Sequence, residues 1–187
     1  MSNRLWIFSG ASAGEFLIDS IVPIAGDPLP VAAYLAVTQE PPGFPSLFSL
    51  SGVLSHERYT TRSEKTALVC RQQAMGRREA RLGALIPIKK SQAWWDLTQD
   101  ERRAIFDERS HHIQLGMEAL PQVARRLHHC RDLAKVEPFD FLTWFDFCEQ
   151  DGAKFDDLLG ALRATEEWRY VEREVEVRVR RPETAPP

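Results

Sequence analysis

Residues 139–147 have the sequence FDFLTWFDF, and this stretch decides the fold. Its pattern repeats every second residue, which is the period of a β-strand. The alternation assigns one set of side chains to a single face: Phe139, Phe141, Thr143, Phe145 and Phe147. We therefore predict a strand here and ask which elements flank it.

Downstream, residues 153–165 carry apolar side chains at the i, i+3, i+4 and i+7 spacing of an amphipathic helix, and Asp151 is suited to cap it. The apolar positions of this predicted helix are Phe155, Leu158, Leu159 and Leu162. After it, valines alternate with charged residues over 168–181, which predicts a final strand.

Upstream, residues 80–88 and 123–129 also predict strands, and a helix between them starts at a capping box formed by Thr98 and Glu101. The resulting order is strand–helix–strand–strand–helix–strand. This order predicts an α+β protein with a ferredoxin-like arrangement, in which an antiparallel sheet carries both helices on one face and leaves the other face open to cover something.

The N-terminal part, residues 1–75, predicts a reduced ferredoxin-like domain made of strands. Three stretches have strand character: 30–39, 46–61 and 65–73. A polar, arginine-rich link at 77–81 leads into the C-terminal domain, which we assign to residues 76–181. The ending RPETAPP predicts a disordered tail at 182–187.

Composition excludes several classes of function. The 187 residues include 24 basic and 27 acidic side chains, so no charge excess points to nucleic acid or to a membrane surface. No apolar run reaches the roughly 18 residues of a membrane span. The apolar patch within residues 4–14 is too short for a secretory signal. The three cysteines, Cys70, Cys130 and Cys148, are odd in number and lack CxxC spacing, so we expect reduced thiols in a cytoplasmic protein.

Arg125 is the unusual residue of the 123–129 strand, because it shares the expected apolar face with Val123 and Leu127. It is either a snorkelling side chain at a sheet edge or a fixed cation over a buried ligand. Arginine suits the second role because it stays protonated when desolvated and offers a planar fork of donors to an oxyanion.

Two histidine pairs are candidates for metal binding. His111 and His112 lie near a helix end, where a histidine commonly complements the helix dipole, and no zinc-type spacing accompanies them. Haem iron, in contrast, needs only one protein ligand. His128, His129 and Cys130 are adjacent in a strand, so their side chains alternate between faces and should have a structural role.

Trp94 and Trp95 follow a basic pair that includes Lys90. They form either a packing cluster at a helix start or an aromatic and cationic rim for a large flat anionic cofactor. Glu167, just before the last strand, is either solvated or accepts the Nδ1–H of a ligating histidine.

The segments PIKKSQAWW (87–95), ARRLHH (124–129), FLTWFDF (141–147) and LRATEEWRYV (162–171) together resemble the chlorite dismutase family of haem b proteins, and His112 precedes Arg125 by the matching thirteen residues. The resemblance implies a dimeric α+β barrel of two ferredoxin-like domains with haem in the C-terminal half. The short chain is similar to the compact, dimeric lineage, which implies a homodimer.

The resemblance also assigns residues to roles. His112 matches the axial iron ligand and Glu167 the carboxylate that bonds it, with His111 as a competitor for the ligand position. Arg125 matches the distal arginine. The remaining matches are Lys90 and Trp94 at the haem edge, Tyr59 at a propionate, and Leu127, Thr143 and Phe145 in the distal pocket.

The implied function is conversion of chlorite to chloride and dioxygen, with Arg125 retaining hypochlorite until the O–O bond forms. Two alternatives remain open: a coproheme decarboxylase or peroxidase-like haem-handling protein of the same fold, and a non-catalytic αβ-barrel module. Arg125 argues against the first alternative, because the related decarboxylases usually carry another residue there.

Overall fold

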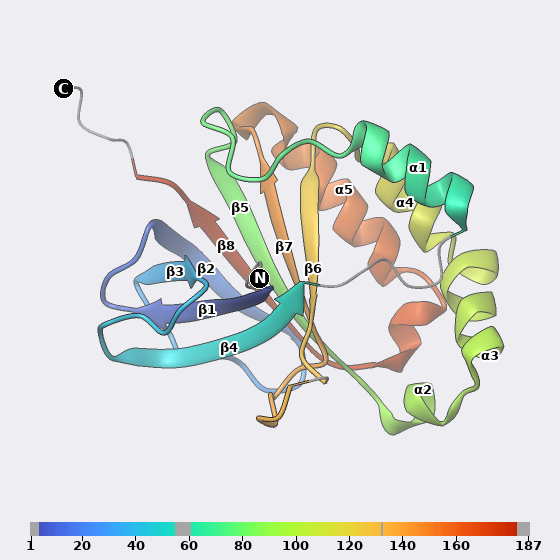
Figure 1. Ribbon diagram of the computed structural model, residues 1–187, viewed down its shortest axis with the longest axis horizontal. Helices are drawn as coiled ribbons and strands as arrows, with labels where there is room; N and C mark the ends of the chain where they lie inside the picture. Colours follow the sequence, from blue (N-terminus) through green and yellow to red (C-terminus); the bar gives the residue numbers. More distant parts are fainter. Residues whose placement is uncertain (1–3, 55–60, 132, 183–187) are drawn as a thin grey trace.

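A computed structural model describes residues 4–54, 61–131 and 133–182. Eight antiparallel strands close into a barrel in the order β1-β3-β2-β8-β5-β7-β6-β4 (Figure 1). The strands are β1 (Leu5–Ala11), β2 (Phe16–Ala25), β3 (Tyr34–Thr38), β4 (Ser46–Leu54), β5 (Leu82–Lys90), β6 (Ala124–His129), β7 (Phe141–Phe147) and β8 (Val171–Arg180). The protein is therefore a mixed α+β fold built on one closed sheet.

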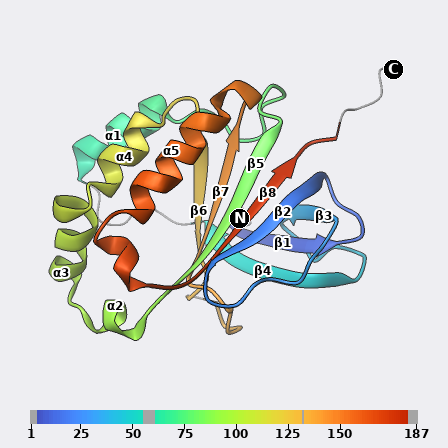
Figure 2. The same cartoon turned by 180° about the vertical axis from the view of Figure 1, so that it is seen from behind.

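The helices gather on one side of strands β5 to β8, and strands β1 to β4 curl away on the other side (Figures 1 and 2). The α-helices are α1 (Arg62–Arg71), α2 (Gln92–Asp96), α3 (Gln99–Arg103), α4 (His112–Glu118) and α5 (Gly152–Arg163). A π-helical segment, Ala104–Arg109, joins α3 to the turn before α4, and a 3-10 segment, η3 (Glu167–Tyr170), leads into β8.

Two apolar cores share the strands of the C-terminal half. Leu85, Leu142 and Val177 point into the barrel, where they pack with Phe8 and Leu35 from the N-terminal strands. The neighbouring residues on the same strands point the other way, toward α5: Ala84, Ile86, Ile88, Phe145 and Phe147 pack with Phe155, Leu158, Leu159 and Leu162. Strands β5 and β7 are thus buried on both faces, and each fully buried large side chain contributes about 1.5–3 kcal/mol.

The structure confirms the strands and the last helix predicted for the C-terminal half. It also corrects the expectation of an open sheet face. That face is the barrel interior, because β2 pairs with β8 and β4 pairs with β6, so the N-terminal strands cover it. Phe139 departs from its predicted face as well: it precedes β7 and packs in the barrel core.

The prediction of a strand at 65–73 is wrong, because this stretch forms most of α1. The helix starts at a capping box in which Thr61 Oγ1 accepts from the Glu64 N–H and the Glu64 carboxylate accepts from the Thr61 N–H. No residue of α1 is buried, so the apolar residues of this stretch do not pack in a core that would require an extended conformation. Strands β1 and β2 were not predicted at all. Of the tail predicted at 182–187, residues 183–187 lie outside the described residues.

Candidate functional site

A pocket lies between the outward face of β5, β6 and β7 and the helices that cover it. Its walls are mostly apolar, with Ile86, Ile88, Phe106, Leu127, Phe141, Phe145, Leu158, Leu159 and Leu162 among the lining residues. A few polar side chains converge on this apolar space: Lys90, His112, Arg125, His129, Thr143 and Glu167. Such a cavity, apolar with a small number of placed polar groups, has the general character of a cofactor site.

His112 is the first residue of α4, and its Nδ1 lies 2.7 Å from Glu167 Oε2. The ring stacks on Phe106, with centroids 4.2 Å apart. Its neighbour His111 is exposed and adopts a left-handed backbone conformation with φ 51°. Because His111 turns the chain between the π-helical segment and α4, the two adjacent histidines point in different directions. Of these two, His112 lines the pocket and His111 does not.

Glu167 is 5% exposed, and three groups hold it. Its carboxylate bonds His112 through Oε2 and the Lys90 ammonium through Oε1, the latter at 2.8 Å. Its backbone N–H donates to Ser110 Oγ at 3.0 Å. Burial alone would raise the pKa of Glu167, but the charges and hydrogen bonds of His112 and Lys90 outweigh burial and lower the pKa to about 2. The carboxylate is therefore ionised at neutral pH, and it accepts the Nδ1–H of His112. This leaves Nε2 as the nitrogen able to bind a metal.

Lys90 lines the pocket at the end of β5. The resemblance assigned it to a cofactor edge, and in the structure its ammonium is buried, bonds Glu167, and lies 4.7 Å from the ring centroid of Trp94 and 5.4 Å from that of Trp168. The lysine thus acts on the histidine side of the pocket through Glu167. The alternation of side chains along β5 could have predicted that Lys90 points toward the pocket, because Lys90 shares a face with Ile86 and Ile88. Trp94 is buried and packs edge-on against Tyr170.

Arg125 extends from β6, directly opposite Phe145 on β7, into the pocket. Its guanidinium lies against Gly116 of α4, so close that a Cβ on that glycine would be 2.1 Å from Nη1. Burial lowers the pKa of Arg125 to about 10, so it remains a cation at neutral pH. Among the residues that the structure describes, no carboxylate forms an ion pair with this guanidinium. The pocket therefore contains a positive charge that no acidic side chain in the described part of the chain neutralises.

Of the other predicted site residues, three line the pocket and one lies outside the described part of the chain. Leu127 and Thr143 face each other across β6 and β7 and line the pocket together with Phe145. Tyr59 lies outside the described residues. His128 points into the barrel, where its Nδ1 bonds the Leu142 carbonyl at 3.1 Å, whereas His129 lines the pocket. Their opposite directions follow the alternation of the strand.

Sequence reasoning missed Phe106, Gly116 and Trp168 as parts of the site. Gly116 could have been found from its spacing, because it follows His112 by one helical turn and shares its face. Phe106 and Trp168 had no local signal, since tertiary packing brings them to the pocket. Within the described parts of the chain, no group of three or more His, Cys, Asp and Glu side chains is arranged to hold a metal ion.

The model of the family described as chlorite dismutase matches residues 29–181. The chain belongs to the chlorite dismutase family. A curated chlorite dismutase from Ideonella dechloratans is 31% identical over 90 residues, a match that covers 48% of this chain and 29% of that protein. The matched stretch is thus less than a third of the length of that relative.

Two solved structures extend the comparison. The crystal structure of dimeric chlorite dismutases from Nitrobacter winogradskyi has 50% sequence identity and a TM-score of 0.88, covering 95% of this chain and 99% of that chain. A chlorite dismutase variant from Candidatus Nitrospira defluvii has 27% identity and a TM-score of 0.59, covering 79% of this chain and 56% of that one. The eight-stranded barrel is therefore similar to that of solved chlorite dismutases. Among the described residues, no helix combines the length and the apolar character needed to cross a bilayer.

Proposed function

We propose that this protein is a haem b enzyme that converts chlorite into chloride and dioxygen. The observation that carries the proposal is Arg125, a half-buried cation without a carboxylate partner among the described residues, in an apolar pocket that also contains His112. A small anion is the ligand that such a charge attracts. Membership of the chlorite dismutase family supports the choice of chlorite.

The residues of the pocket fit a haem group. A flat macrocycle needs apolar walls and one axial ligand, and the pocket has both: walls that include Ile86, Phe145 and Leu158, and an imidazole with Nε2 left to bind iron. Gly116 follows His112 by one turn and carries no side chain, and the Arg125 guanidinium lies in the space beside it. A glycine is suited to a position where backbone approaches a ligand closely.

The residues divide the work as follows. His112 would hold the haem iron through Nε2, and Glu167, by accepting the Nδ1–H, would fix the imidazole and make it a stronger donor. When bound, the haem would supply redox-active iron for the oxygen chemistry of chlorite. Arg125 attracts the anion and retains hypochlorite by charge and hydrogen bonding, because its pKa of about 10 keeps it protonated. Leu127, Thr143 and Phe145 line the same space and exclude water.

An oxygen electrode tests the proposal directly. Haem-loaded protein should release dioxygen equal in amount to the chlorite consumed. The Arg125→Ala variant should keep its haem spectrum but release hypochlorite to a chlorination trap and bleach sooner, while Arg125→Lys, which keeps the charge without the planar fork, should fall between them. A flat oxygen trace with a normal haem spectrum would refute chlorite conversion and favour decarboxylation or haem handling.

A second variant tests the iron ligand. His112→Ala should lose the axial bond, which changes the visible spectrum of the haem-loaded protein. His111→Ala is the matched control, since His111 is exposed, and it should leave the spectrum as in the wild type. An unchanged spectrum in His112→Ala would remove this residue from the site.

We also propose the finer points of organisation. The strand order β8-β5-β7-β6 supports a ferredoxin-like C-terminal domain over residues 76–181, and four strands without intervening helices support a reduced N-terminal domain over 1–75. Similarity to the dimeric protein from Nitrobacter winogradskyi supports a homodimer, which light scattering would test. Free cysteines at positions 70, 130 and 148 are in keeping with a cytoplasmic location.

A further inference from the structure

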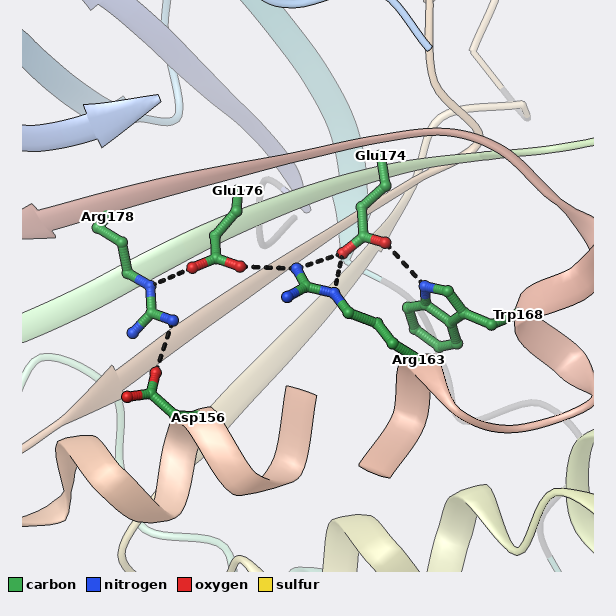
Figure 3. Close-up of polar contacts among 6 residues, drawn as sticks. All are labelled: Asp156, Arg163, Trp168, Glu174, Glu176 and Arg178. Atoms are coloured by element: carbon green, nitrogen blue, oxygen red, sulfur yellow. Dashed lines mark hydrogen bonds and ion pairs between the residues drawn. The ribbon is translucent and has the colours of Figure 1, made fainter. Parts of the chain in front are cut away.

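A ladder of charged side chains links α5 to β8 (Figure 3). Glu174 of β8 is fully buried, and its neighbour on the same face, Glu176, is 9% exposed. Arg163, the last residue of α5, donates to both, with 2.6 Å from Nη2 to Glu174 Oε1 and 2.6 Å to Glu176 Oε2. Arg178 continues the ladder from Glu176 to Asp156 at the surface.

Glu174 is the end of this ladder nearest to the pocket. Its second oxygen, Oε2, accepts from the indole Nε1–H of Trp168 at 2.7 Å. One carboxylate therefore binds both ends of the turn that connects α5 to η3: Arg163 before the turn and Trp168 after it (Figure 3). A fully buried carboxylate is costly to desolvate unless it is paired and hydrogen-bonded, and here both of its oxygens are occupied.

The clamped turn carries the carboxylate of the functional site. Glu167 directly precedes Trp168 in η3 and points into the pocket, where it bonds His112. The Trp168 ring also lines the pocket, 5.4 Å from the Lys90 ammonium that is the other partner of Glu167. Fixing the indole thus fixes both the backbone next to Glu167 and one aromatic neighbour of Lys90.

We propose that Glu174 is a positioning residue for the His112–Glu167 pair, acting through the indole of Trp168. This inference rests on the proposed function, because it concerns how His112 is held when it binds iron. A hydrogen bond to the carboxylate also makes the indole ring more electron-rich, which strengthens its attraction for the Lys90 ammonium. Both effects leave Glu167 better placed to accept the proton of His112.

Two variants separate positioning from general support of the fold. Glu174→Gln removes the charge at nearly constant shape, and Arg163 keeps Glu176 as a partner. Trp168→Phe removes the indole donor, together with part of the ring, and leaves the Glu174–Arg163 pair in place. Asp156→Asn is the matched control, because it alters the far, exposed end of the same ladder, where Asp156 bonds Arg178.

The first readout uses protein without haem. In 15N-labelled protein, the indole resonance that disappears in Trp168→Phe belongs to Trp168. In Glu174→Gln this resonance should move upfield and its hydrogen exchange should become faster, whereas Asp156→Asn should leave both as in the wild type. An unchanged resonance in Glu174→Gln would overturn the clamp itself.

The second readout is the iron–histidine stretching band in the resonance Raman spectrum of the ferrous, haem-loaded protein, which reports how strongly the histidine donates. The band should move to lower frequency in Glu174→Gln and Trp168→Phe, and the haemin dissociation constant should rise by up to about 10-fold, at the low end for residues that support a ligand indirectly. Asp156→Asn should match the wild type.

The outcomes distinguish this inference from the proposed function. A normal wild-type band with the same frequency in Glu174→Gln and Trp168→Phe would overturn the positioning role and leave the proposed function intact. A wild type without any iron–histidine band would overturn histidine ligation and, with it, the role of Glu174 in supporting it.

Discussion

The buried ion pair between Lys90 and Glu167 provides a sharp test of the site, because an exposed pair of the same length lies beside it. Lys90 Nζ is 2.8 Å from Glu167 Oε1, and the two side chains are 3% and 6% exposed. Lys89 Nζ is also 2.8 Å from Glu172 Oε1, but those side chains are 44% and 51% exposed. Distance is therefore constant between the two pairs, and burial differs.

Coulomb's law sets the scale of the buried interaction. At 2.8 Å and an effective dielectric constant of about 20, the attraction between Lys90 and Glu167 is about 6 kcal/mol before the cost of desolvation. Lys90→Met leaves the carboxylate buried without its cation, so we expect the free energy of unfolding to fall by about 3–5 kcal/mol. Lys89→Met should lower it by less than about 1 kcal/mol, because solvent screens the exposed pair.

The assay is urea denaturation of the haem-free protein at pH 7. The single variants Lys90→Met and Glu167→Gln and the double variant complete a double-mutant cycle, and the two losses should fail to add by roughly 2–3 kcal/mol. Equal losses for Lys90→Met and Lys89→Met, or additive losses in the cycle, would refute the conclusion that Lys90 and Glu167 form a buried, coupled pair.

Three further predictions concern other parts of the structure. Gly116→Ala adds a methyl group where Arg125 lies, so the haemin affinity, measured from the Soret band, should fall. The control is Gly160→Ala, whose added Cβ has nothing within 4 Å. It should leave the haemin affinity unchanged and raise the free energy of unfolding by about 0.5–1 kcal/mol. Burial lowers the pKa of His128 to about 4, below its usual 6.5, so the unfolded state binds the proton first. The contribution of neutral His128 to the free energy of unfolding should therefore be fully present above about pH 6.5 and should fall toward pH 4 by up to roughly 1.4 kcal/mol per pH unit. Urea titrations at several pH values should show a shallower pH dependence of this free energy in His128→Gln. An equal dependence in the variant and the wild type would contradict the assignment. Thr98→Ala removes the cap of α3 and should cost about 1 kcal/mol, and a loss below about 0.3 kcal/mol would mean that the cap contributes little.

Local pattern predicted the C-terminal elements because their signals lie within short windows. The strand at 141–147 and the helix at 152–163 follow from periods of two and 3.6 residues. The capping box at Thr98 marked the start of α3 in the same way. It did not mark where that helix ends, since the π-helical segment and the left-handed His111 interrupt the chain before α4.

The N-terminal half was predicted less well for a physical reason. Strand β2 carries several exposed side chains and owes its place to pairing with β8, whose partner residues lie 149 to 163 positions further along the chain. Helix α1 buries nothing, so its apolar residues gave the wrong period. In both cases the local sequence constrains the conformation weakly and long-range contacts, or a cap, decide it.

The sequence by itself determined the order of the C-terminal elements, the faces of their strands and the residue types available for the proposed haem site, because side-chain alternation and helical spacing are properties of a few neighbouring residues. Tertiary structure alone decided how those faces are used. Closure of the barrel buries one face of β5 to β8 and leaves the helix-covered face for the pocket. Packing of η3 against β5 buries the ion pair between Lys90 and Glu167. The turn at His111 directs His112, and not His111, toward the pocket. These outcomes depend on contacts between residues far apart in the chain, which no local pattern specifies.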